Sequence, residues 1–145
     1  MINERIYLEE GNENVYLDVY VADRLGDYVR DAILIIPGGG FYMVSDIESE
    51  PVAMAFMPYG FNAFVLNYSV TAKEKRAFPA HLIQASLASA YVDNGLKFEL
   101  HVYPGKGNHG VALANEMTSC SNEKSVDGAM AKWVENAVIW SKGIK

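Results

Sequence analysis

His109 and two glycine-rich runs are the residues of this sequence best suited to do chemistry. Residues 37–40 read PGGG, and residues 103–110 read YPGKGNHG with His109 near the end. Consecutive glycines leave backbone amides unobstructed, and such amides can hold a negative oxygen. An imidazole titrates near neutral pH, so a loop histidine can act as a general base. Each feature also has a simpler interpretation: PGGG as a turn that ends a strand, and His109 as an exposed loop residue.

The second run also matches G-x-G-x-x-G, the spacing of a dinucleotide-binding turn, through Gly105, Gly107 and Gly110. That turn follows a strand directly, opens a helix onto the pyrophosphate, and is followed about twenty residues later by an acid. Here Pro104 separates strand and turn, and the residues after the run form a poor helix. The only acid at the required distance is Asp127, which begins a predicted helix. We therefore do not interpret this run as a nucleotide loop.

Composition indicates a soluble globular protein with one domain over residues 1–145. Half of the chain is hydrophobic and 21% is charged, which suffices for a real core. The formal net charge of −6 argues against a nucleic-acid partner. No signal-like or membrane-spanning apolar run occurs in the sequence, so we expect a cytoplasmic protein with no membrane partner. The single cysteine, Cys120, excludes an internal disulfide and a cysteine zinc cluster, and we expect neither metal nor cofactor.

Strand-forming runs alternate with helical patterns along most of the chain. Residues 5–10 and 14–22, separated by Gly11, predict an antiparallel hairpin. More continuous apolar runs, typical of strands buried on both faces of a parallel sheet, follow at residues 32–36, 61–70 and 96–104. Three helices are predicted. The first runs from Ser49 to Gly60 with Pro51 in its first turn, and the second from Pro79 to Gly95 with apolar side chains at fourfold spacing, namely Ile83, Leu87 and Tyr91. The third begins at Val126 and has an apolar face of Met130, Trp133, Ala137 and Trp140.

The alternation of strands and helices also predicts where the glycine runs meet. Right-handed crossovers place the strand of residues 61–70 on one side of the strand of residues 32–36, and the strand of residues 96–104 on the other. Such a reversal of direction is a topological switch point, where open α/β sheets bind their ligands. Both glycine runs leave strands at this point. We therefore expect the PGGG amides to face His109 across one cleft.

Around these residues the sequence resembles α/β-hydrolase esterases of the acetyl-esterase and lipase type, including xylan-esterase-like members. Residues 33–70, beginning ILIIPGGGF, are similar to their N-terminal part, and residues 95–116 to the segment with the catalytic histidine. The resemblance implies that Gly39 and Gly40 supply oxyanion amides, where relatives often have HGGG, and that His109 is the triad base. It also implies an α/β fold: a reduced α/β-hydrolase-like three-layer sandwich, with a mostly parallel sheet and an N-terminal antiparallel hairpin.

The sequence departs from that family in its nucleophile. The family's serine lies in G-x-S-x-G on a strand–turn–helix elbow, and this motif occurs nowhere in the 145 residues. The chain thus looks internally shortened, or truncated, with the seam near residues 82–91. Other serines, the cysteine and the nearest acids lie in no matching motif: Ser45, Ser86, Ser89, Cys120, Asp46 and Glu116.

Three functions remain open. The resemblance predicts a carboxylic-ester hydrolase that keeps the oxyanion loop and the histidine but, without its serine, is weakly active or inactive. The alternative is a non-catalytic domain that binds a small ligand or a partner in the old cleft; a third is a shortened product with no selected activity. The expected ligand is a small ester or carboxylate. A small sheet with an exposed edge also predicts a homo-oligomer.

Overall fold

A computed structural model describes residues 2–23, 26–40, 42–70, 73, 83–84, 112–119, 126, 128 and 130–143. The chain forms two compact units, Met1–Gly95 and Leu96–Lys145. The expectation that residues 1–145 form one domain stays a prediction.

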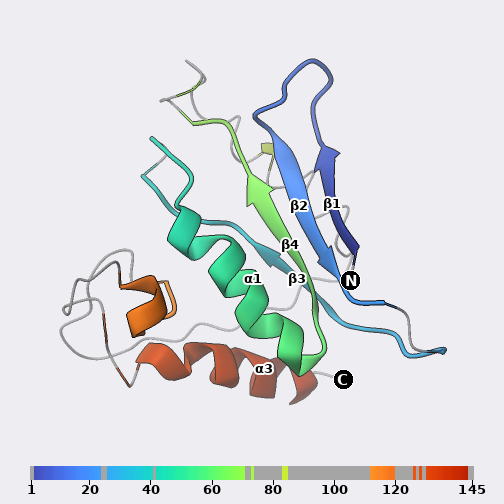
Figure 1. Ribbon diagram of the computed structural model, residues 1–145, viewed down its shortest axis with the longest axis vertical. Coiled ribbons are helices and arrows are strands. Elements are labelled where there is room, and N and C mark those ends of the chain that lie inside the picture. The colour runs from blue at the N-terminus through green and yellow to red at the C-terminus, as the bar shows by residue number, and fades with distance from the viewer. Residues whose placement is uncertain are drawn as a thin grey trace. The chain divides into compact units, whose positions relative to one another are not determined.

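The first unit is built on a mixed sheet of four described strands (Figure 1). Its strands are β1 (Ile2–Tyr7), β2 (Tyr16–Val21), β3 (Ala32–Ile35) and β4 (Asn62–Asn67), in the order β1-β2-β4-β3. β1 and β2 pair antiparallel, as do β2 and β4, whereas β3 and β4 pair parallel. The predicted hairpin and the predicted parallel neighbours are thereby confirmed. The third predicted parallel strand, at residues 96–104, lies outside the described residues.

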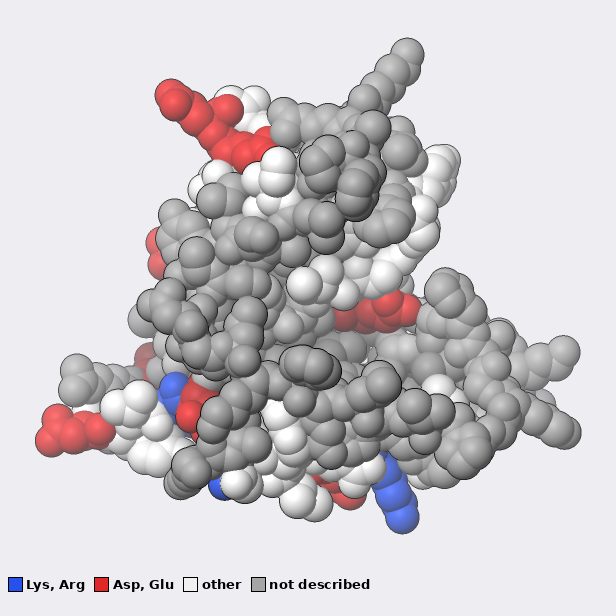
Figure 2. Space-filling view, turned by 180° about the vertical axis from the view of Figure 1, so that it is seen from behind, with Lys and Arg blue, Asp and Glu red and all other residues white. Residues whose placement is uncertain are grey.

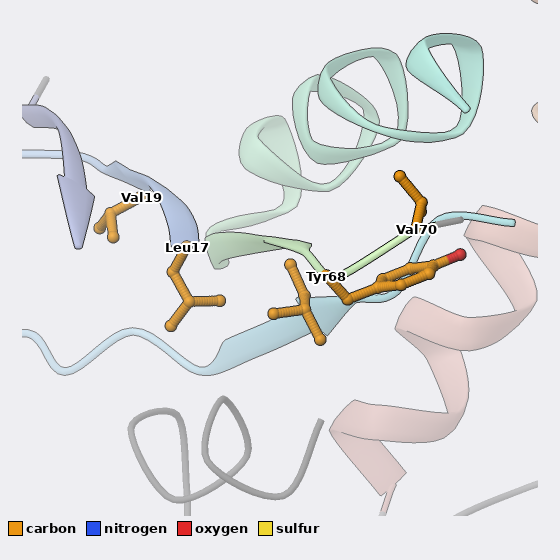
Figure 3. Close-up of a cluster of buried hydrophobic side chains, with 5 residues drawn as sticks. Leu17, Val19, Tyr68 and Val70 are labelled. Atoms are coloured by element: carbon orange, nitrogen blue, oxygen red, sulfur yellow. The ribbon is translucent and has the colours of Figure 1, made fainter. Parts of the chain in front are cut away.

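Alternating side chains on β2 create the core of this sheet. Leu17 and Val19 are buried, whereas Tyr16 and Asp18, which alternate with them, are partly exposed, and this is the period of a half-buried strand. The register places Leu17 opposite Leu66 of β4, so apolar side chains stack on one face. Figure 3 shows the resulting group, which we call the sheet cluster; its members are Leu17, Val19, Leu66, Tyr68 and Val70.

Helix α1 (Glu50–Phe56) packs against β4 (Figure 1). It begins as predicted, with Pro51 in its first turn, where a missing amide costs no intrahelical bond. A 3-10 turn continues the helix (Met57–Tyr59), and Gly60 stops it in the left-handed region, with φ of 93°. The buried face of α1 consists of Val52, Ala53 and Phe56.

Strand β3 is less buried than its continuous apolar run predicts. Of its residues only Ile35 is buried, and Ile36, directly after the strand, is 54% exposed. A strand is buried on both faces only where a layer covers each face. Among the described elements, α1 packs chiefly against β4, which leaves β3 partly open.

A polar network centred on the buried Gln84 links the hairpin turn to the end of β4. Gln84 is fully buried; its Oε1 accepts from Ser69 N at 2.8 Å, and its Nε2 donates to Ser69 Oγ at 2.7 Å and to Glu9 Oε1 at 2.9 Å. Asn12 Nδ2 donates to the other oxygen of Glu9 at 2.9 Å. The neighbouring Ile83, which the helical spacing places on the apolar face, is 56% exposed. At this point the polar side chain of Gln84 is buried, and the apolar side chain of Ile83, which the helical period predicts to be buried, is exposed.

In the second unit, the predicted C-terminal helix is present as α3 (Trp133–Gly143), preceded by a 3-10 turn (Met130–Lys132). Val134 and Val138, four residues apart, are its buried side chains. The predicted apolar face, which includes Trp133 and Ala137, is only partly buried. The buried side chains are each one residue later in the sequence, so the packed face of the helix differs from the predicted one by one position. None of the described helices has the length and apolarity needed to cross a membrane.

Acidic side chains are more prominent than basic ones on the face drawn in Figure 2, considering the described residues alone. This distribution agrees with the formal net charge of −6. A nucleic-acid-binding surface would need clustered Lys and Arg.

Candidate functional site

The glycine loop, residues 37–40, follows β3 directly and has a backbone that requires glycine. Gly39 has φ of 134°, and a Cβ built there would lie 1.9 Å from the carbonyl oxygen of Met43. No other residue type fits at this position. Gly40 has φ of 60° with open space around the position of a Cβ.

The carbonyl groups of this loop are held by the turn that follows it. Gly38 O accepts from Ser45 N at 2.9 Å, and Gly39 O accepts from Tyr42 N at 3.1 Å. In a trans peptide the N–H points opposite to the C=O. The amides of Gly39 and Gly40, each in a peptide whose carbonyl is held, therefore point away from those partners.

One of the three glycine amides is occupied and two are not. Gly38 N donates to Glu48 Oε2 at 2.7 Å. The amides of Gly39 and Gly40 have no partner among the described residues. Two unengaged donors on adjacent residues are the groups that an oxyanion would use. Their predicted role in holding such an oxygen stays a prediction.

Tyr68 holds the start of the loop from the sheet side. Its hydroxyl donates to Pro37 O at 2.7 Å, and its side chain belongs to the buried sheet cluster (Figure 3). Burial raises the pKa of Tyr68 above its usual value, and the negative charge of Glu48 adds to this. The phenol therefore remains a protonated donor through neutral and mildly alkaline pH.

The structure describes some of the other predicted site residues and not others. His109 lies outside the described residues, so its approach to the glycine loop stays a prediction; the same applies to Ser86, Ser89 and Cys120. Ser45 takes part in local hydrogen bonding through its backbone, as expected for a loop residue. The carboxylates of Asp46 and Glu116 are exposed and have no hydrogen-bond or ion-pair partner among the described residues.

A well-tied segment begins three residues after His109. Ala112 and Ala114 both have left-handed backbones, with φ of 47° and 52°, which is unfavourable for a residue with a Cβ. Trp133 Nε1 donates to Ala112 O at 3.0 Å, and Thr118 Oγ1 accepts at 3.1 Å from the amide between the two alanines. These bonds offset the cost of the strained alanines, and they fix the chain just beyond the predicted histidine loop.

Glu48 and Tyr68 are the residues that sequence reasoning missed. Glu48 lies in an acidic stretch, SDIESEP, whose similarity to the family placed it only before the first helix. Tyr68 lies in an apolar run and looks like an ordinary core residue. Strand alternation could have placed Tyr68 on the face of Leu66, but no pattern links either side chain to the glycine loop.

Comparison with solved structures identifies the fold. The chain is similar to an α/β hydrolase enzyme from a Medee basin deep-sea metagenome library, with a TM-score of 0.80 over 99% of this chain and 97% of that one, at 20% identity. The chain has the α/β-hydrolase fold. The fold class is thus confirmed, although the described strands form a mixed sheet, not a mostly parallel one.

Proteins with higher identity cover less of the chain. An acetyl ester-xyloside bifunctional hydrolase from Caldicellulosiruptor lactoaceticus is 32% identical, with a TM-score of 0.51 over 59% of this chain and 34% of that one. Endo-1,4-beta-xylanase B of Butyrivibrio fibrisolvens is 51% identical over 43 residues, which are 30% of this chain and 7% of that protein. This chain therefore spans a small part of the curated relative it matches. No family model matches. The resemblance to esterase- and lipase-like α/β hydrolases is confirmed, while the internal shortening stays a prediction.

Proposed function

We propose that this α/β hydrolase is an esterase-type domain that binds a small ester or its carboxylate product at the glycine loop. The single observation that supports this most is the pair of unengaged amides, Gly39 and Gly40, at the carboxyl end of β3. The esterase class is further supported by the acetyl ester-xyloside hydrolase among its structural relatives.

The chemistry assigned to each group follows from ester hydrolysis. Attack on the ester carbonyl moves negative charge onto its oxygen, and two fixed amides stabilise that charge as it develops. His109 accepts the proton of the attacking oxygen and returns it to the leaving alcohol. Because the sequence holds no G-x-S-x-G, the attacking oxygen is that of water or of a residue from another chain. We therefore expect slow turnover, since loss of a triad member leaves roughly 10³- to 10⁴-fold acceleration over water.

The test is the hydrolysis of p-nitrophenyl acetate by the wild-type chain and by His109→Ala. Exposed imidazoles attack this ester without any site, so His81→Ala serves as the matched control. A loss of most of the rate in His109→Ala, with little change in His81→Ala, is the expected result. Equal rates in the two variants would show that the histidine loop does not act in hydrolysis.

The missing elbow also favours a second function, a non-catalytic domain that holds a small anion at the same amides. In that case acetate or phosphate shifts the amide resonances of Gly39 and Gly40 on titration, and p-nitrophenyl acetate is hydrolysed no faster than in buffer. A chain that neither binds these anions nor hydrolyses the ester would contradict both proposals.

A further inference from the structure

A single peptide group at the start of the glycine loop is held by two side chains, one 10 and one 31 positions along the chain from the atom it bonds. Tyr68 Oη donates to Pro37 O at 2.7 Å, and Glu48 Oε2 accepts from Gly38 N at 2.7 Å. These are the two polar atoms of the Pro37–Gly38 peptide, and they point to opposite sides. We propose that Glu48 and Tyr68 form a peptide clamp, a pair of positioning residues that anchors the first peptide of the loop and so keeps the Gly39 and Gly40 amides in the direction that the turn bonds give them. This inference rests on the proposed function.

The clamp answers a physical problem that three glycines create. Glycine loses more conformational freedom on folding than any other residue, so each peptide of the run needs a bond to fix it. The turn bonds to Gly38 O and Gly39 O hold two of these peptides, and the Pro37–Gly38 peptide remains. Oxyanion donors are effective because they are already aimed when charge develops. Pro37 restricts its own φ to about −65°, which leaves the orientation of the next peptide to be set. The two side-chain bonds set it.

Glu48 and Tyr68 connect the loop to different parts of the first unit. Glu48 ends the short 3-10 helix Asp46–Glu48 that precedes α1, whereas Tyr68 follows β4 in the sheet cluster (Figure 3). The peptide is thus fixed between the core and the segment that leads into α1. A bond to an ionised acceptor is also stronger than one between neutral groups.

Gly38 provides the space that the clamp needs. A Cβ built at Gly38 would lie 2.6 Å from Glu48 Oε2, whereas the backbone there is not in the left-handed region. Alanine at this position is therefore compatible with the backbone but displaces the carboxylate. Gly38→Ala therefore disturbs the Glu48 side of the clamp without altering Glu48.

The experiment follows the glycine amides by ¹⁵N NMR in the wild-type chain and in Glu48→Ala, Glu48→Gln, Gly38→Ala and Tyr68→Phe. Hydrogen exchange of the Gly38 amide reports on the clamp, and titration with acetate reports on the Gly39 and Gly40 amides. We expect Glu48→Ala and Gly38→Ala to lose roughly tenfold or more in Gly38 protection, as for a lost bond to a charged group. Acetate affinity should fall about tenfold in the same variants, and also in Tyr68→Phe.

Glu48→Gln separates positioning from charge. The amide oxygen of glutamine can still accept from Gly38, so protection should remain close to that of the wild type. Acetate should bind at least as tightly, because the negative charge beside the loop is gone. A loss of affinity equal to that of Glu48→Ala would overturn the proposal, since acceptor geometry would then not suffice.

Two further outcomes separate the clamp from the function on which it rests. If Gly38 protection and acetate affinity are unchanged in Glu48→Ala, there is no clamp, whatever the chain binds. If Gly38 protection responds as expected but the wild-type chain neither binds acetate nor hydrolyses p-nitrophenyl acetate, the proposed function is wrong while the clamp itself stands.

Discussion

Alanine at Gly39 should damage this protein far more than alanine at Gly40, although the two residues are adjacent. At Gly39 the backbone has φ of 134°, a region that only glycine adopts readily, and the new Cβ would lie 1.9 Å from Met43 O. At Gly40, φ of 60° is a conformation that alanine can adopt, and no atom lies within 4 Å of the new Cβ.

The expected magnitudes follow from these two environments. Holding a residue with a Cβ at the Gly39 backbone costs about 1–3 kcal/mol. Moving the Met43 carbonyl to relieve the overlap also disturbs the hydrogen bonds to Gly39 O, at about 1 kcal/mol each. The free energy of unfolding should therefore fall by about 3 kcal/mol or more in Gly39→Ala. In Gly40→Ala the left-handed backbone costs about 1–2 kcal/mol, partly offset by the lower entropy of the unfolded alanine chain.

Urea unfolding followed by far-UV circular dichroism measures this difference. Tryptophan fluorescence is less suitable, because both tryptophans, Trp133 and Trp140, lie in α3 of the second unit, whereas the glycine loop belongs to the first. A difference of about 2 kcal/mol between the variants is a large part of a typical domain stability of roughly 5–15 kcal/mol. Hydrolysis of p-nitrophenyl acetate should be lost in Gly39→Ala and largely kept in Gly40→Ala, which retains its amide. Equal stabilities of the two variants would refute the assignment of these backbone conformations.

Two further predictions concern buried polar groups. Tyr68→Phe should lose about 1 kcal/mol near neutral pH. Burial, aided by the charge of Glu48, raises the pKa of Tyr68 in the folded protein. The stabilisation by Tyr68 is therefore complete below the unfolded pKa of about 10 and is lost as pH rises through the higher folded pKa. In urea unfolding, the difference in unfolding free energy between the wild type and Tyr68→Phe should narrow above about pH 10, and a constant difference would contradict this. Gln84→Ala should cost about 2–4 kcal/mol in the same assay, because it removes the hydrogen bonds of a fully buried side chain to Ser69 and Glu9. Ile83→Ala, at an exposed neighbour, should cost under about 0.5 kcal/mol.

Local signals account for the part of the fold that the sequence predicts. The alternation of apolar and polar residues predicts β2 as one strand of the hairpin. Pro51 and Gly60 mark the two ends of the first helix. The apolar run of residues 32–36 predicts β3. Each of these depends on residues that are close in sequence, where backbone preference and side-chain period act directly.

The parts that the sequence does not predict depend on side chains that meet across long separations. Gln84 lies next to an apolar residue at helical spacing, and its burial is set by hydrogen bonds to Ser69 and Glu9. Tyr68 meets Pro37 across 31 positions. A polar residue type tells which bonds a side chain can form, but not which backbone atom the fold will bring to it.

The same distinction applies to the glycine loop, whose role as an oxyanion site stays a prediction. A turn that only ends a strand needs one flexible residue, whereas this loop uses each of its three glycines for a different physical reason. Gly38 makes room for the Glu48 carboxylate, Gly39 allows the chain to pass against Met43 O, and Gly40 has a left-handed backbone in open space. Three glycines lose more conformational entropy on folding than other residues would, and two side chains then hold the start of the loop, which is the arrangement that the proposed amide site requires.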